Sequence, residues 1–201
     1  SDRANRAILE TSLSNIVEAN RFPQRMMLFS TYSGWHQSFI SLAEDMPFVT
    51  ARDYQVYLAR LAQYPKLNDE ALRITQQAVN GGYVLPCAVL GNSAASISGV
   101  MTDDATKSRY YAPFLRARPR DLSDMQWRAL QVEAQQIISN VINPAYAKHL
   151  AFFNTVYLKK CAVKPGISAQ PGGAAYYAFR VRQETTTDLT PEQIHNIGLS
   201  E

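Results

Sequence analysis

Histidine and cysteine, which supply many metal ligands and nucleophiles, are scarce in this sequence of 201 residues. The three histidines are His36, His149 and His195, and none belongs to an H-E-x-x-H arrangement, so a helical zinc pair of that kind is excluded. A histidine hydrogen-bonded within the packing is favoured for all three, over a ligand or a proton-transfer group. The sequence also lacks the common nucleophile, phosphate-loop and EF-hand motifs. No familiar catalytic motif is therefore present.

The two cysteines, Cys87 and Cys161, lie far apart and in no metal-ligand spacing. Two buried free thiols are the favoured interpretation. A single disulfide remains open, because a sequence cannot show that two distant residues meet.

Strong charge of one sign is also missing. The formal net charge is only +3, so charge alone predicts neither a nucleic-acid partner nor a membrane partner. The one long uncharged stretch, residues 74–102, contains Gly81, Gly82 and Pro86, which interrupt both the apolar run and the helix. We therefore expect a buried helix pair there and no membrane span.

What is present is a globular composition, with 46% hydrophobic and 18% charged residues. Hydrophobic periodicity and capping residues predict a succession of helices. We expect them over residues 1–22, 24–45, 50–64, 68–81, 86–101, 123–160 and 190–198. Ser123 with Gln126, and Thr190 with Gln193, match the capping-box pattern. Pro144 should kink or split the longest helix.

The character of the sequence changes after Cys161. Residues 164–174 are rich in Pro and Gly and predict a loop, and the alternation in residues 175–184 predicts a strand. An edge strand there could pair with an extended peptide, which makes Tyr176, Tyr177 and Arg180 candidate binding residues. Packing of the strand against the helices is the alternative.

The expected fold is therefore mainly α: a helical array with a long kinked helix and one or two β-strands near the C-terminus. We expect a helical region over residues 1–163, followed by a loop, strand and short helix over residues 164–201. The chain begins without Met, and Ser200 resembles the N-cap of a further helix. We therefore expect the whole chain to be a fragment of a larger single domain.

The C-terminal third resembles a bacterial family catalogued as domain of unknown function 885. The resemblance rests on Gly172-Gly173 with Tyr176-Tyr177, and on a Thr-Thr pair followed by Leu189-Thr190-Pro191-Glu192 and Ile194-His195, then Gly198-Leu199. Upstream, Asn143-Pro144-Ala145-Tyr146, Tyr157, Gly81-Gly82 with Pro86, and Tyr54 with Leu58 and Leu61 are similar to the family in order and spacing. The resemblance covers most of residues 50–201.

The resemblance implies a helical zinc peptidase of the gluzincin type. Family members carry their His-Glu and Pro-Gly-His segments well downstream of the Thr-Pro-Glu segment, beyond Glu201. It follows that this chain holds no cofactor and no catalytic residue, while the intact parent holds zinc. Its partners would be a peptide substrate and the remainder of the parent chain, in the periplasm or at the cell surface. By the same resemblance Tyr176 and Tyr177, with Gly172 and Gly173, would line the substrate cleft.

Two hypotheses follow. In the first, the chain is the cleft-forming, non-catalytic part of a zinc peptidase, and its exposed apolar surface lacks partners. In the second, it is a helical protein-binding or structural module without metal, which predicts a self-contained core and no vacant interface.

Overall fold

The computed structural model describes residues 2–30 and 33–201 and is mainly helical, as expected. Two isolated bridges, Phe29–Gly34 and Pro86–Ala162, are the strand-like pairings in the described ranges, and these ranges contain no sheet. The α-helices are α1 (Asp2–Ala19), α2 (Trp35–Ser38), α3 (Leu42–Asp45), α4 (Ala51–Ala62), α5 (Tyr64–Asn80), α6 (Ser93–Ser98), α7 (Asp124–Ile137), α8 (Asn143–Phe152), α9 (Gly173–Thr185) and α10 (Pro191–Ser200). Short 3₁₀ segments are η1 (Pro23–Met26), η2 (Cys87–Val89), η3 (Ala105–Lys107), η4 (Arg109–Leu115), η7 (Leu158–Lys160) and η8 (Ile167–Ala169).

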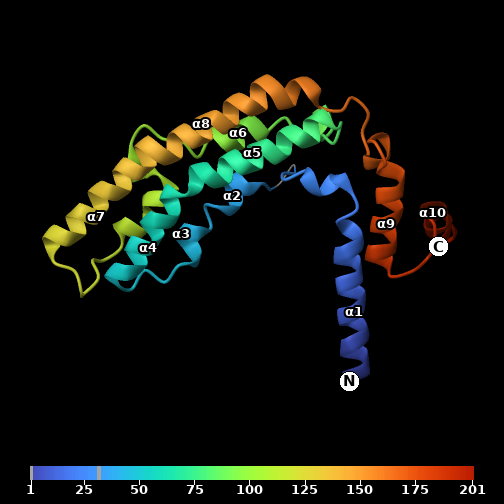
Figure 1. Ribbon diagram of the computed structural model, residues 1–201, viewed down its shortest axis with the longest axis horizontal. Coiled ribbons are helices and arrows are strands. Elements are labelled where there is room, and N and C mark those ends of the chain that lie inside the picture. Colours follow the sequence, from blue (N-terminus) through green and yellow to red (C-terminus); the bar gives the residue numbers. More distant parts are fainter. Residues whose placement is uncertain (1, 31–32) are drawn as a thin grey trace.

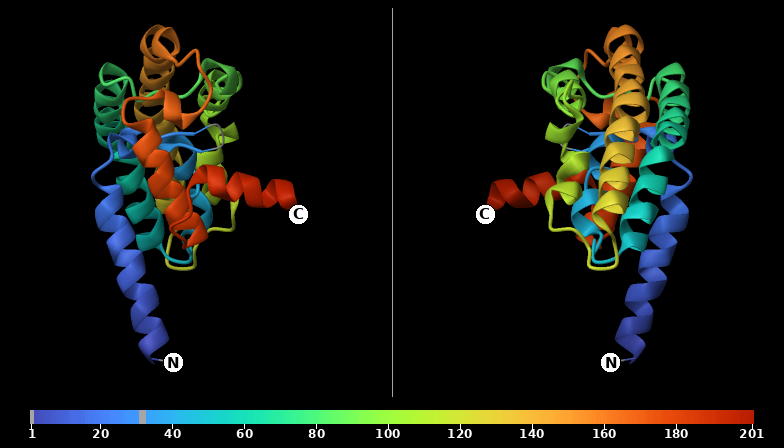
Figure 2. Two further views of the ribbon diagram at one scale, coloured as in Figure 1. Left: turned by 90° about the vertical axis from the view of Figure 1, so that its right-hand side faces the viewer. Right: turned by 90° about the vertical axis from the view of Figure 1, so that its left-hand side faces the viewer.

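The body of the molecule is built around one long helical rod. It starts with α7, continues through the π-helical segment η5 (Ile138–Ile142), α8 and the π-helical segment η6 (Phe153–Tyr157), and ends with η7. The bent pair α4–α5 lies along this rod, with α4 against α7 and α5 against α8, and α6 also packs on α8 (Figure 1). Helices α1 and α9 project from one end of the body, and α10 points away from both (Figure 2).

The core between these helices is rich in aromatic side chains. Tyr54, Tyr57 and Leu61 of α4 are fully buried, and Trp127 and Tyr146 of the long rod are buried opposite them. Two of the buried tyrosines hydrogen-bond to the backbone: Tyr54 and Tyr57 donate to backbone carbonyls of η4 at 3.2 and 2.8 Å. Each bond satisfies a polar group that would be costly to bury alone.

The predicted capping boxes are confirmed. The side chain of Ser123 accepts from the backbone N–H of Gln126, and the side chain of Gln126 accepts from the N–H of Ser123. Thr190 and Gln193 form the same reciprocal pair at the start of α10. These bonds satisfy N–H groups that lack partners within the helix, which is why a local pattern predicts them correctly.

The long helix expected over residues 123–160 is confirmed, and its α-helical hydrogen bonding is interrupted before Pro144. Pro144 lacks an N–H, so the carbonyl of Asn140 cannot receive the usual helical bond. The rod accommodates this by widening into η5 just before Pro144, and then resumes as α8. The bend of a long helix, of 36°, lies instead in the helical stretch from Ala51 to residue 80.

Other helix boundaries differ from the expectation. Pro65 does not stop a helix but sits in the first turn of α5, where its missing N–H costs nothing. Asn68, expected as an N-cap, is buried inside α5. Its side chain accepts from the indole N–H of Trp35 at 3.0 Å and donates to the carbonyl of Ala145 at 3.1 Å. Asn68 therefore ties three elements together.

The single helices expected over residues 24–45 and 86–101 are wrong. The first region is broken into η1, α2 and α3, and the second into η2 and α6. In the first region Gly34 is extended and pairs with Phe29, which turns the chain and lets Phe29 enter the core. Tertiary burial overrides the local helical spacing here.

The predicted strand over residues 175–184 is also wrong, because this stretch is helix α9. The buried positions are Gly173 and Phe179, and Tyr176, Val181 and Gln183 are partly buried; apart from Val181 they are spaced three or four residues apart. This is the spacing of one helix face, and the alternation of apolar and polar residues was coincidental. Ser200, expected to cap a further helix, is the last residue of α10.

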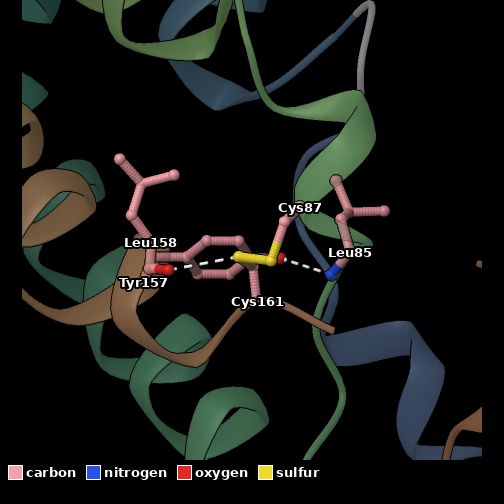
Figure 3. The surroundings of a disulfide bond; sticks show 5 residues. All are labelled: Leu85, Cys87, Tyr157, Leu158 and Cys161. Atoms are coloured by element: carbon pink, nitrogen blue, oxygen red, sulfur yellow. Dashed lines mark hydrogen bonds between the residues drawn. A yellow bond between two sulfur atoms is a disulfide. The ribbon is translucent and has the colours of Figure 1, made fainter. Parts of the chain in front are cut away.

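The prediction of two free thiols is wrong as well, because Cys87 and Cys161 form a disulfide (Figure 3). It joins η2 to the end of the long rod across 74 residues of sequence. Backbone bonds flank it: the N–H of Cys87 donates to the carbonyl of Ala162 at 2.9 Å, and the N–H of Leu85 donates to the hydroxyl of Tyr157 at 2.9 Å. Within the described ranges, no helix has both the length and the hydrophobicity needed to cross a bilayer.

Candidate functional site

The start of α9 is determined by two glycines. Gly172 has a φ of +64°, a left-handed conformation that other residues rarely adopt. Gly173 is buried against η8, and a Cβ added there would lie 1.8 Å from the carbonyl oxygen of Ile167. The Gly-Gly pair is thus needed to dock α9 on η8.

Helix α9 packs against the end of α1 through an aromatic cluster. The ring of Phe22 stacks on Phe179, with centroids 5.2 Å apart, and meets Tyr176 edge-on at 5.4 Å. The guanidinium of Arg182 lies over the Phe179 ring and pairs with the carboxylate of Glu18 at 2.5 Å. These contacts set the position of α1 relative to α9.

The five predicted site residues lie together at the N-cap and in the first part of α9 but have different environments. Tyr176 is half-buried in the cluster with Phe22, while Tyr177 is 46% exposed. Arg180 is exposed and pairs with Glu184, one turn along the same helix, at 2.5 Å. Gly172 and Gly173 shape the backbone. Because α9 is a helix, its interior N–H and C=O groups are already paired, so the strand-pairing mechanism expected for a peptide is not possible here.

A groove lies between the first half of α1 and the C-terminal end of α9. Ile8, Thr11 and Ser12 form one side, and Thr186 and Asp188 form part of the other. The five predicted residues do not line it. The groove is therefore distinct from the predicted site, and both polar and apolar residues line it.

A second feature, not found from the sequence, lies in the body. The imidazoles of His36 and His149 are both buried and meet edge to face, with ring centroids 5.2 Å apart. His36 Nε2 lies 3.1 Å from the hydroxyl of Ser96, and the ring of His149 stacks on Trp35 at 4.2 Å. In the described ranges, Nδ1 of each histidine is buried without a hydrogen-bond partner.

Burial lowers the pKa of His36 to about 4. Burial also lowers the pKa of His149 to about 3, with His36 adding a smaller effect of the same sign. Both rings are therefore neutral near pH 7 and border a small cavity lined by Ser33, Ser96 and Phe153.

The residues in this cavity do not fit a catalytic zinc. Such a site needs about three protein ligands, and the cavity offers two imidazoles and no carboxylate. Across residues 2–30 and 33–201, no group of three or more His, Cys, Asp or Glu residues is placed to hold a metal ion. The third histidine, His195, is exposed on α10. The His36–His149 pair could not be predicted because the two residues lie on α2 and α8, far apart in sequence.

Comparison with known proteins gives a family and a fold. The chain matches, over residues 1–201, the family model described as bacterial protein of unknown function, DUF885. A solved structure described as the "putative lipoprotein" from Colwellia psychrerythraea superposes with a TM-score of 0.73 at 24% sequence identity. The match covers 79% of this chain and 27% of that chain, so this chain spans about a quarter of the neighbour's length. No curated protein matches significantly.

Proposed function

Because the chain belongs to the bacterial family DUF885, we propose that it forms the helical, non-catalytic part of a zinc-dependent peptidase. In this proposal the remainder of the parent protein supplies the metal and the general base. This chain supplies one wall of the substrate cleft. In this proposal no catalytic step passes through the residues of this chain.

The observation that carries this proposal is the unpartnered apolar face of α1. No residue of this 18-residue helix is buried. Its large apolar side chains remain 52–65% exposed: Ile8, Leu9, Leu13, Ile16 and Val17. An isolated helix with such a face is expected to pack on another element. The greater length of the solved neighbour supports the remainder of the parent chain as that element.

The position of α9 supports the proposed role of the tyrosine pair. Helix α9 lies beside α1 (Figure 1), and the side chain of Tyr177 is exposed on it. We infer that Tyr177 and Arg180 face the cleft as side-chain contacts to the peptide, while Tyr176 positions α9 through Phe22. The peptide backbone would then be held by groups of the remainder.

The disulfide supports an exported location. Structural disulfides form and persist in oxidising compartments such as the bacterial periplasm. The Cys87–Cys161 bond therefore favours the periplasm or the cell surface, in agreement with the description of the solved neighbour.

The second candidate function, a helical protein-binding module without metal, is favoured by the self-contained core. Residues from Phe29 to Tyr157 bury their own aromatic cluster and do not need α1, α9 or α10 for it. In that case α1 would bind a separate protein.

The two candidates are separated by assaying the full gene product on a mixture of peptides, with and without a zinc chelator. The peptidase proposal expects hydrolysis that the chelator abolishes. It also expects a Tyr177→Ala/Arg180→Ala double variant to raise KM with little change in kcat. Arg120→Ala, on an exposed loop of the body, is the matched control. Absence of chelator-sensitive hydrolysis would leave the binding module as the function.

A further inference from the structure

The end of the long rod carries an exposed group of lysines. Lys159 and Lys160 are the last residues of η7, and Lys164 follows three residues after Cys161. All three are exposed, and none forms an ion pair within the described part of the chain. We call residues 158–164, together with Val89, the cationic tip.

The charge of the cationic tip is not balanced by its surroundings. Residues 71–102 and 134–183, which build this end of the molecule, contain no Asp or Glu. On the neighbouring helices, the carboxylates of Asp69 and Glu18 are already paired with Lys148 and Arg182. The tip is therefore a local positive surface on a chain whose net charge is only +3.

Apolar side chains are exposed among these lysines. Val163 is 93% exposed, and Leu158 and Val89 are each 38% exposed. The disulfide holds the two segments together (Figure 3). Ala162 also donates its N–H to the carbonyl of Leu85 at 3.0 Å. The lysines and apolar groups are thus presented side by side on a cross-linked scaffold.

We propose that the cationic tip binds the surface of an anionic phospholipid membrane. Clustered lysines are attracted to anionic headgroups, and short apolar side chains beside them can enter the headgroup boundary. A protein partner is disfavoured because lysine is depleted from protein–protein interfaces. A nucleic-acid partner would leave Val163 without a function. This inference does not depend on the proposed peptidase role.

Binding through three lysines is weak and reversible. We expect the affinity for anionic vesicles to exceed that for neutral vesicles by on the order of a hundredfold at low salt. As the salt concentration is raised, screening of the charges should reduce this difference in affinity.

The test is flotation of the protein with vesicles of phosphatidylcholine alone, or with about a third phosphatidylglycerol. The first variant is Lys159→Glu/Lys160→Glu/Lys164→Glu. The matched control is Arg52→Glu/Lys66→Glu/Arg128→Glu, which changes the net charge equally at exposed positions of the body. The second variant, Val163→Asp, keeps the lysines. Circular dichroism confirms that each variant is folded.

The proposal expects binding to phosphatidylglycerol vesicles only. The tip variant should lose about tenfold or more in affinity, Val163→Asp should bind more weakly, and the control should retain binding. Absence of binding to anionic vesicles, or equal loss in the control, overturns it. Equal binding to single-stranded DNA with no effect of Val163→Asp also overturns it, because the tip would then be a general polyanion site.

Discussion

His36 and His149 lie edge to face in the core, 5.2 Å apart between ring centroids, and each has a buried Nδ1 without a hydrogen-bond partner among residues 2–30 and 33–201. Two imidazoles in this arrangement cannot both be protonated without placing like charges together in a medium of low dielectric constant. The fold therefore depends on their neutral forms.

This dependence predicts a loss of stability in mild acid. The folded pKa values of about 4 and about 3 lie below the unfolded value of 6.5, so the unfolded state binds more protons between pH 6.5 and 4. Stability is therefore complete above about pH 6.5 and falls as the pH decreases, by on the order of 3 kcal/mol per histidine. Urea denaturation across this range measures the slope.

Replacing both imidazole rings with apolar rings should make the stability less dependent on pH. We expect His36→Phe/His149→Phe to show little change in stability between pH 7 and 5, apart from the contribution of carboxylates. His195→Gln, on the exposed α10, is the control and should keep the wild-type slope. If the stability of the double variant fell with decreasing pH as steeply as that of the wild type, the two histidines would not be its cause.

A second prediction concerns the disulfide. Its 74-residue separation means that reduction should lower the free energy of unfolding by about 4 kcal/mol in the chain-entropy account. Thermal denaturation with and without a thiol reductant measures this loss. Cys87→Ser/Cys161→Ser should be as unstable as the reduced wild type and insensitive to reductant. A thiol titration that finds two free cysteines in the native protein would contradict the pairing.

A third prediction concerns the start of α9. Gly173→Ala places a Cβ on the carbonyl of Ile167, so η8 or α9 must move, at a cost of about 3 kcal/mol. Gly198→Ala is the matched control, because it is helical with nothing within 4 Å of the added Cβ. Melting temperatures should fall for the first variant and not for the second.

A fourth prediction concerns the anchor of α1. Phe22→Ala removes both ring contacts to α9, so α1 should detach more often. Limited trypsin digestion should then cleave after Arg21 faster than in the wild type, because local opening exposes the backbone. Leu9→Ala, on the exposed face of α1, should leave the cleavage rate unchanged.

Features with a local cause could be predicted from the sequence. The capping boxes at Ser123 and Thr190 depend on residues three apart, and the interruption of the α-helix before Pro144 depends on one missing N–H. The mainly helical class follows from the same local periodicity. Family membership could also be inferred, because its motif is long and contiguous.

Features that depend on distant contacts could not be predicted. Phe29 and Gly34 break the expected helix because the core, not the local spacing, determines their conformation. The stretch after Gly173 alternates as a strand does, but it forms helix α9, whose buried Phe179 stacks on the distant Phe22. The Cys87–Cys161 bond and the His36–His149 pair join segments whose proximity appears only in the folded chain.

The central claim, that this chain is the metal-free part of a larger zinc peptidase, is tested most directly by the native protein. The measurement is its intact mass and zinc content after purification from its own cells. We predict a mass well above 22.5 kDa and about one zinc per molecule, which residues 1–201 expressed alone do not bind. A native protein with the mass of this chain and no bound zinc would contradict the account.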